Sequence, residues 1–288
     1  MKPARFSYEA PPTLDAALAS LAAHADEAKV IAGGQSLAPM MNMRLAQPGH
    51  LIDINGLRDL ARIAREGDRL VVGALVRHAD LACDPHARAH CAMLAHAAGT
   101  IGHYAIRQRG TLGGSLAHAD PAAQLPLVAV ALGAEMEVVS IRGSRTIPAS
   151  DFFLSIFTTA LASDELLIRV RFPLTAPHQG WGFRLFNRRA GDFALASVAA
   201  TLMRAAGDGV AQLCLAVGGI GPVPVRLDLP AERTKHGPLD ADWPRRVGQA
   251  AADAAEIEAG EQISADYRRE LVAALAEDAL ADAMGRTR

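Results

Sequence analysis

The stretch Val30–Leu45 reads VIAGGQSLAPMMNMRL, in which a short apolar run stops at Gly33 and Gly34 and the polar residues Gln35 and Ser36 follow. Two residues without Cβ let backbone N–H groups approach an anionic oxygen closely, and a pyrophosphate is the usual anion at such a turn. A lone Gly-Gly pair more often serves only as a turn with positive φ. The pair therefore needs a second feature to indicate ligand binding.

The same pattern occurs again further along the chain. Arg107–Ala119 reads RQRGTLGGSLAHA, with Gly113 and Gly114 followed by the small hydroxyl residue Ser115. Two glycine turns of matching chemistry predict two walls of one site for an extended, phosphate-bearing cofactor. Neither turn is the GxGxxG of a Rossmann unit and no Walker sequence occurs, which disfavours a simple NAD or ATP domain.

The N-terminal part predicts a small strand-helix-strand unit. Thr13 is a suitable N-cap for a helix over Leu14–His24, whose apolar residues recur at helical spacing. Short apolar strands are expected at Lys29–Ala32 and His50–Ile54. We expect this first subdomain to span residues 1–55.

The middle of the chain alternates short strands with helices. Strands are expected at Leu70–Val72 and Glu135–Ser140, and Leu166–Phe172 alternates as a half-buried strand does. The segment 174–180, LTAPHQG, has the composition of a linker. The second subdomain is therefore expected over residues 56–175.

The last third predicts a separate α+β domain over residues 176–288. Alternating small residues in Phe193–Met203 and Gln212–Val217 are typical of antiparallel strands in a sheet covered on one face. Helices are expected over Val247–Ala259 and Ala265–Met284. The chain as a whole is predicted to be α+β.

Composition and charge exclude several classes of partner. The 288 residues are 50% hydrophobic and carry a formal charge of -2, so no charged field favours nucleic acid or a membrane surface. No apolar run approaches the ~20 residues of a membrane span, and the start MKPARFSYEAPP lacks a signal-peptide core. A cytoplasmic protein without a transmembrane segment is expected.

No metal site or catalytic group stands out. Cys83, Cys91 and Cys214 form no C-x-x-C pair, so neither a disulfide framework nor an iron-sulfur cluster is expected on this chain. His118 and Asp120 have no further ligand at metal spacing, which favours a hydrogen-bonded loop. Arg107 and Arg109 could face phosphate, although basic residues beside a glycine turn are more often solvated.

Longer stretches resemble a known family. AGGQSLAPMMNMRLAQP (32–48) and IGHYAIRQRGTLGGSLAHADPAAQLP (101–126) resemble the FAD-binding medium subunit of molybdenum hydroxylases, the family of xanthine dehydrogenase and aerobic carbon monoxide dehydrogenase. RRAGDFALASVA (188–199), VGGIGPVPVR (217–226) and SADYRRELVAALAEDAL (264–280) resemble the C-terminal domain of that family. The resemblance covers nearly the whole chain.

The resemblance implies a fold and a set of cofactor contacts. The fold is a two-subdomain FAD-binding domain of the PCMH/vanillyl-alcohol-oxidase type, followed by an antiparallel sheet with helices. Gln124 stands where the family usually has an acidic residue, and Phe193 where some relatives have a tyrosine near the flavin ring. The implied FAD-binding residues are Val30, Ile31, Ala32, Gly33, Gly34, Gln35, Ser36, Leu37, Ile101, Thr111, Leu112, Gly113, Gly114, Ser115, Gln124, Leu167 and Phe193.

The resemblance also implies a role in electron transfer. The chain would pass electrons through FAD from the [2Fe-2S] clusters of a small partner subunit to an external acceptor. A large partner subunit would hold the molybdenum cofactor and oxidise the substrate, in a heterotrimer that dimerises. Two alternatives remain open at this point: a stand-alone FAD-dependent oxidoreductase, and a flavin-free assembly protein of the same fold. A visible flavin spectrum and the metal content of co-purifying partners separate them.

Overall fold

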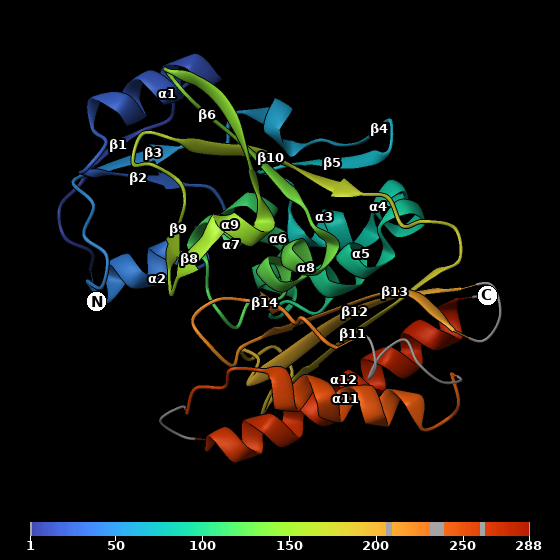
Figure 1. Cartoon of the computed structure of the whole chain (residues 1–288). Helices are drawn as coiled ribbons and strands as arrows, with labels where there is room; N and C mark the ends of the chain where they lie inside the picture. Colours follow the sequence, from blue (N-terminus) through green and yellow to red (C-terminus); the bar gives the residue numbers. More distant parts are fainter. Residues whose placement is uncertain (1, 206–208, 231–238, 260–262, 288) are drawn as a thin grey trace.

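A computed structural model (Figure 1) describes residues 2–205, 209–230, 239–259 and 263–287. The N-terminal part forms a three-stranded parallel sheet in the order β1-β3-β2. Its elements are β1 (Ser7–Glu9), α1 (Leu14–Ala23), β2 (Ala28–Ile31), α2 (Leu37–Asn42) and β3 (His50–Asp53). Thr13 caps α1 as expected, since its Oγ1 accepts the N–H of Ala16 at 3.2 Å.

The middle part is built on a five-stranded antiparallel sheet in the order β4-β5-β10-β6-β7. A short 3-10 helix, η1 (Arg58–Ala61), precedes it. The strands are β4 (Ile63–Glu66), β5 (Arg69–Gly73), β6 (Glu135–Ser140), β7 (Gly143–Pro148) and β10 (Leu166–Pro173). A two-stranded ribbon, β8 (Phe153–Ser155) and β9 (Thr158–Thr159), packs against the helices α9 (Ala149–Phe152) and α7 (Leu112–His118).

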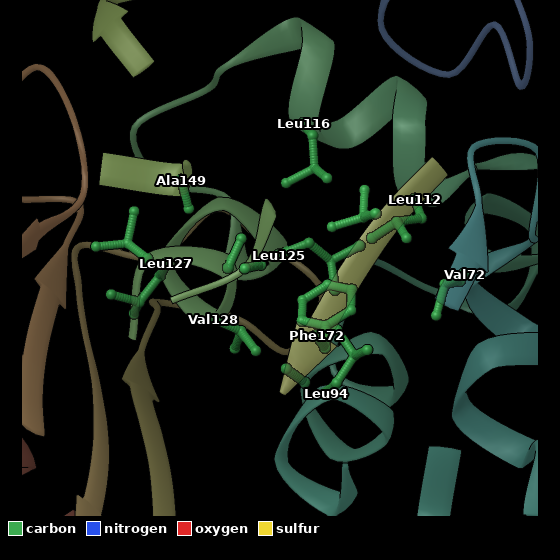
Figure 2. Close-up of a cluster of buried hydrophobic side chains, with 14 of the residues drawn as sticks. Val72, Leu94, Leu112, Leu116, Leu125, Leu127, Val128, Ala149 and Phe172 are labelled. Atoms are coloured by element: carbon green, nitrogen blue, oxygen red, sulfur yellow. The ribbon is translucent and has the colours of Figure 1, made fainter. Parts of the chain in front are cut away.

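Seven helices of this middle part pack beneath the sheet (Figure 1). They are α3 (His78–Cys83), α4 (Pro85–His90), α5 (Ala92–Gly99), α6 (Tyr104–Arg109), α7 (Leu112–His118), α8 (Gln124–Leu132) and α9 (Ala149–Phe152). Figure 2 shows Leu112 and Leu116 of α7 and Leu125 of α8 gathered around Phe172 of β10. All four side chains are fully buried, so α7 is fixed in place by the main core.

The last part is a four-stranded antiparallel sheet in the order β11-β12-β13-β14 with two helices. Its elements are β11 (Gln179–Phe186), β12 (Ala196–Arg204), β13 (Val210–Gly218), β14 (Val225–Arg226), α11 (Trp243–Ala254) and α12 (Ala265–Arg286). The helix expected over Val247–Ala259 instead begins at Trp243, with Pro244 in its first turn, and ends at Ala254. Proline favours the first turn because its missing N–H costs nothing there.

This last sheet is covered on both faces, so the expectation of one covered face is wrong. Val198 and Ala200 of β12 pack with α11 and α12, whereas Ala199 joins the main core beneath α5 and α8. Figure 1 shows the sheet between these two helical layers. Small residues in β12 serve both contacts. The alternation in its sequence therefore did not reveal that the second face is also covered.

Within the described residues, no helix combines the length and the apolar character that crossing a membrane requires.

Candidate functional site

The two glycine segments lie directly against each other. A Cβ placed on Gly33 would stand 2.3 Å from the carbonyl oxygen of Arg109 and 2.9 Å from Cα of Gly110. Only glycine allows this approach of two main chains, because any side chain at Gly33 would overlap Arg109. The turn Gly33–Ser36 therefore lies beside Arg109 and Gly110, which immediately precede the segment Thr111–Ser115.

The turn Gly33–Ser36 presents unused backbone donors. Gly34 has φ +69°, a conformation that glycine adopts at little cost. In the described chain, the N–H groups of Gly34, Gln35, Ser36 and Leu37 have no hydrogen-bond acceptor. The Gln35 side chain folds back, and its Nε2 donates to the carbonyl of Gly33 at 3.0 Å. Successive free N–H groups at a turn form a concavity suited to an anionic oxygen.

The segment Thr111–Ser115 differs from this turn, so the expectation of matching chemistry is wrong. Gly113 and Gly114 lie in the first turn of α7, with Thr111 as its N-cap. Gly114 N–H donates to Thr111 Oγ1 at 3.1 Å, and Ser115 N–H donates to the Thr111 carbonyl at 3.0 Å. These amides are already bonded, so this segment offers the half-buried Ser115 hydroxyl and the exposed Gly114 rather than free backbone donors.

The same segment is anchored to the chain after β5. Leu112 N–H donates to the carbonyl of Val76 at 3.0 Å, and Gly113 N–H donates to that of Ala74 at 2.9 Å. A Cβ on Gly113 would stand 2.5 Å from Cβ of Ala74. Gly113 is thus required for packing. Among the described residues, a Cβ on Gly114 would meet only the side-chain Oγ1 of Thr111, the N-cap residue of α7, at 2.8 Å.

A chain of polar side chains joins the two segments. Asn55 Nδ2 donates to the carbonyl of Ala32 at 2.7 Å, and Arg77 Nη2 donates to Asn55 Oδ1 at 2.6 Å. Nη1 of the same guanidinium donates to the carbonyl of Arg109. We call these contacts the Asn55–Arg77 bridge, because the two side chains connect the residues beside both glycine segments.

Asp53 and Tyr8 hold one end of this bridge. Asp53 Oδ1 accepts from the backbone N–H and the Nδ2 of Asn55 at 2.8 and 2.6 Å, and its Oδ2 accepts from the Tyr8 hydroxyl at 2.8 Å. Burial by itself would raise the pKa of Asp53, but these three donors together with nearby Arg109 hold the pKa below its usual value. Asp53 is therefore a carboxylate at neutral pH.

Two further groups belong to the same region. Burial, and then the nearby charge of Arg109, lower the pKa of Arg77, so two cations lie close together here. His78 is buried, and burial lowers its pKa to about 4. Its Nε2 lies 2.9 Å from the carbonyl of Thr111, which can only accept, so Nε2 carries the proton. Nδ1 of His78 is buried with no hydrogen-bond partner.

The apolar residues that the resemblance implies as FAD contacts lie in different parts of the structure. Val30 and Ala32 pack against the N-terminal core, and Ile31 and Leu37 are half-buried beside the turn. Leu112 and Leu167 are buried in the main core, so their side chains pack against other apolar side chains of that core.

Ile101 and Phe193 come from two parts of the chain that meet. Ile101 is half-buried against the main core, and Phe193 is 69% exposed. A Cβ on Gly191 would stand 3.0 Å from His103 Nδ1 and 3.3 Å from the carbonyl carbon of Gly102. The loop that carries Phe193 therefore lies on the loop that follows Ile101.

Gln124 begins α8 and is buried, with 6% of its surface exposed. Its side-chain amide has no hydrogen-bond partner in the described chain. Its amide atoms are not among the fully buried polar atoms that lack a partner, so the amide remains accessible to a ligand or water. This observation is consistent with the role that the resemblance implies for this position.

The remaining candidates have structural partners. His118 stacks on Phe157 with ring centroids 4.7 Å apart, and among the described residues no group of three or more His, Cys, Asp or Glu could hold a metal ion. Arg107 Nη1 donates to the carbonyls of Ile101 and Gly102 at 2.9 and 3.0 Å. Arg107 is therefore bonded within the protein rather than fully solvated.

Sequence reasoning missed Tyr8, Asp53, Asn55, Arg77 and His78. One signal was available for two of them: Asp53 lies at the end of the expected strand at His50–Ile54, and Asn55 follows that strand. Since β2 and β3 are parallel, the carboxyl ends of both strands meet at one edge, and polar residues there lie beside Gly33. Tyr8, Arg77 and His78 carried no comparable signal.

Comparison with known proteins identifies the family. Residues 4–175 match the FAD binding domain in molybdopterin dehydrogenase, and residues 181–283 match the CO dehydrogenase flavoprotein C-terminal domain. The chain belongs to the FAD-binding medium subunits of the molybdenum hydroxylases. This family supplies flavoprotein subunits of molybdenum-dependent oxidoreductases.

Individual medium subunits are similar over their full length. The chain is 39% identical over 289 residues to the nicotine 6-hydroxylase medium subunit of Paenarthrobacter nicotinovorans, covering 100% of both chains. It is 36% identical over 290 residues to the carbon monoxide dehydrogenase medium chain of Hydrogenophaga pseudoflava, covering 99% of both. A chain in the crystal structure of quinoline 2-oxidoreductase from Pseudomonas putida 86 superposes with a TM-score of 0.94 at 33% identity, covering 100% of both.

The geometry fits the FAD that a medium subunit binds. In the described chain, the turn Gly33–Ser36 offers free backbone N–H donors, Gly114 is exposed, and the Gln124 amide has no protein partner. These are the features that a diphosphate and a hydrogen-bonding ring system require.

Proposed function

We propose that this medium subunit is the FAD-containing electron-transfer subunit of a heterotrimeric molybdenum hydroxylase. The observation that carries the proposal is the row of free amides from Gly34 to Leu37 in the described chain, directly after Gly33, which lies against Arg109 and Gly110, in a chain of this family. Bound FAD would supply the one- and two-electron chemistry that links iron-sulfur clusters to an external acceptor. The protein contributes binding, position and electrostatics.

The residues proposed to bind FAD divide by type of contact. The turn Gly33–Ser36 with Leu37 would donate backbone N–H groups to the diphosphate, and Ser115 would donate its hydroxyl. Gln124 would complete its hydrogen bonds on the cofactor. Backbone and apolar contacts would come from the other residues that the resemblance implies: Val30, Ile31, Ala32, Ile101, Thr111, Leu112, Gly113, Gly114, Leu167 and Phe193.

The proposal places the iron-sulfur clusters on another chain. A [2Fe-2S] cluster normally takes four protein ligands, most often cysteine thiolates, and this chain has only three cysteines. Two of them, Cys91 and Cys214, are buried and far apart in the sequence. We therefore infer a small [2Fe-2S] subunit and a large molybdenum-cofactor subunit as partners, in a heterotrimer that dimerises, in the cytoplasm.

We further propose that the chain divides at about residues 55 and 175. Each boundary falls between two sheets: β3 of the first sheet ends at Asp53, and β10 of the second ends at Pro173. Under this proposal residues 1–55 and 56–175 form the FAD-binding domain, and residues 176–288 form the C-terminal domain.

The test is to purify the chain alone and together with co-expressed partners. We expect the visible spectrum of oxidised flavin on the chain itself, and molybdenum and iron only when the partners are present. A colourless chain that does not take up added FAD would refute the proposal and would favour the flavin-free assembly protein. A flavin-containing chain that turns over an organic substrate without partners would favour the stand-alone oxidoreductase.

A further inference from the structure

We propose that Arg77 is a positioning residue for the diphosphate of the cofactor. Through the Asn55–Arg77 bridge it holds the turn Gly33–Ser36 at a set separation from the segment Thr111–Ser115. The inference rests on the proposed function, in which FAD binds between these two segments. Neither Asn55 nor Arg77 belongs to a glycine segment, so their contribution is to geometry.

The bridge closes a ring of contacts around the junction of the segments. Asn55 bonds the carbonyl of Ala32, Arg77 bonds Asn55, and the same guanidinium bonds the carbonyl of Arg109. The ring closes because that Arg109 oxygen lies against Gly33, the residue after Ala32. The Arg109 carbonyl is thus held between Gly33 on one side and Arg77 on the other.

Only an arginine can make both contacts of the bridge. Two separate nitrogens, Nη1 and Nη2, donate to acceptors on two different segments, and the planar fork fixes the angle between them. Lysine has a single nitrogen on a flexible stem and cannot reproduce that geometry. Both acceptors are neutral, and in the described part of the chain Arg77 forms no ion pair, so its positive charge is not cancelled by direct contact.

The other end of the bridge is rigid. Asn55 is held by two bonds to Asp53, which Tyr8 of β1 also contacts. Orientation of the Asn55 amide is fixed by these bonds, since Nδ2 must point to the carboxylate and Oδ1 to Arg77. A shift of either glycine segment would therefore break a bond in this chain.

The experiment measures ligand affinity of the full chain. FAD binding is followed by the quenching of flavin fluorescence, and ADP, which carries the diphosphate without the flavin, is measured by competition. The variants are Arg77→Lys and Arg77→Met. We expect both variants to bind FAD and ADP about 10- to 100-fold more weakly, as expected for the loss of charged hydrogen bonds that set a binding geometry.

Two comparisons separate positioning from general stability. Arg65→Met removes an exposed arginine of β4 whose sole bond within the described residues is to the carbonyl of Gly67, and it should leave both affinities unchanged. Asn55→Ala breaks the bridge from its other end. In that background Arg77→Met should cost much less additional affinity, because the two residues act through one connection.

The outcomes distinguish this inference from the proposed function. A wild-type chain that binds neither FAD nor ADP refutes both. Wild-type binding with Arg77 variants that retain their affinity refutes the inference alone, as does a fully additive Asn55 and Arg77 pair. Loss of FAD affinity with unchanged ADP affinity also overturns it, because the bridge would then act away from the diphosphate.

Discussion

The first glycine of each pair, Gly33 and Gly113, has other residues where a Cβ would stand. The second glycine of each pair is less enclosed: Gly34 has a positive φ and an added Cβ would stand 3.3 Å from Cδ1 of Ile31, and Gly114 is exposed, with the Thr111 hydroxyl 2.8 Å from an added Cβ. At the scale of single residues, the first glycines are therefore required by the fold itself. The second glycines are the ones whose replacement tests the ligand.

Gly114→Leu is expected to remove FAD binding while leaving the fold intact. The new side chain would lie on the exposed side of α7, and among the described residues its Cβ would closely meet the Thr111 hydroxyl, the far end of a side chain that can rotate. We expect at least about 100-fold weaker FAD binding, equivalent to ~2.8 kcal/mol, in a fluorescence titration. Gly285→Leu, at a helical position with nothing within 4 Å, is the matched control. Unchanged FAD affinity in Gly114→Leu would place the site elsewhere.

His78 is expected to make stability depend on pH. Its pKa is about 4 in the folded chain and about 6.5 when unfolded, so the unfolded state binds more protons between these values. Stability therefore falls as pH drops from about 6.5 to 4, by roughly 3 kcal/mol in total.

The measurement compares urea unfolding at pH 7 and pH 4.5 for the wild type and for His78→Gln. Glutamine keeps a donor for the Thr111 carbonyl but does not titrate. The free energy of unfolding of the variant should therefore fall less between pH 7 and pH 4.5 than that of the wild type. Equal pH dependence in the two proteins would show that His78 does not ionise in this way.

At the scale of elements, α12 packs on the last sheet with almost no space between the main chains. A Cβ on Gly182 of β11 would stand 1.9 Å from the carbonyl oxygen of Ala279, and one on Gly180 would stand 1.9 Å from that of Ala283. Both glycines let the helix lie directly on the strand. The contact joins the last helix to the centre of the molecule.

Gly182→Ala is expected to destabilise the chain by at least about 1–3 kcal/mol, because the helix must move to make room. Chemical denaturation gives the free energy of unfolding. Gly56→Ala, with nothing within 4 Å of the added Cβ, is the control and should change stability little. A neutral Gly182→Ala would mean that α12 adjusts freely on β11.

Sequence patterns predicted where helices and strands lie better than they predicted which faces of a strand are buried. The strand Glu135–Ser140 was predicted with the bounds it has, and Thr13 was correctly identified as a cap, because alternation and capping are local signals. The second covered face of β12 was missed, since alanine suits helix packing and strand alternation alike.

The candidate site was predictable only in part. Glycine pairs are visible in a sequence, and so is a family resemblance around them. The Asn55–Arg77 bridge was not, because its contacts join residues 22 to 32 positions apart, and such pairings depend on the tertiary fold.

At the scale of the whole molecule, the three cysteines report on the intact core. Cys83 is exposed, while Cys91 and Cys214 are buried, and burial raises the pKa of Cys91 to about 12. A buried thiol with a raised pKa reacts slowly because only the thiolate attacks.

A thiol-reactive chromogenic reagent should therefore titrate one cysteine in the native chain and all three after denaturation. The Cys83→Ser variant should show none before denaturation. Two or three fast-reacting thiols in the native wild type would indicate that the main core opens readily.

The central position of β10 has a consequence for how the protein is made. β10 is the last strand of its sheet to leave the ribosome, yet it pairs with β5 on one side and β6 on the other. Ala74, which anchors the segment Thr111–Ser115, donates its N–H to the carbonyl of Ile168 in β10 at 2.9 Å. A nascent chain shorter than about 170 residues therefore has both glycine pairs but lacks the strand that fixes one of them. If FAD binds at the proposed site, we expect cofactor loading to follow the synthesis of β10.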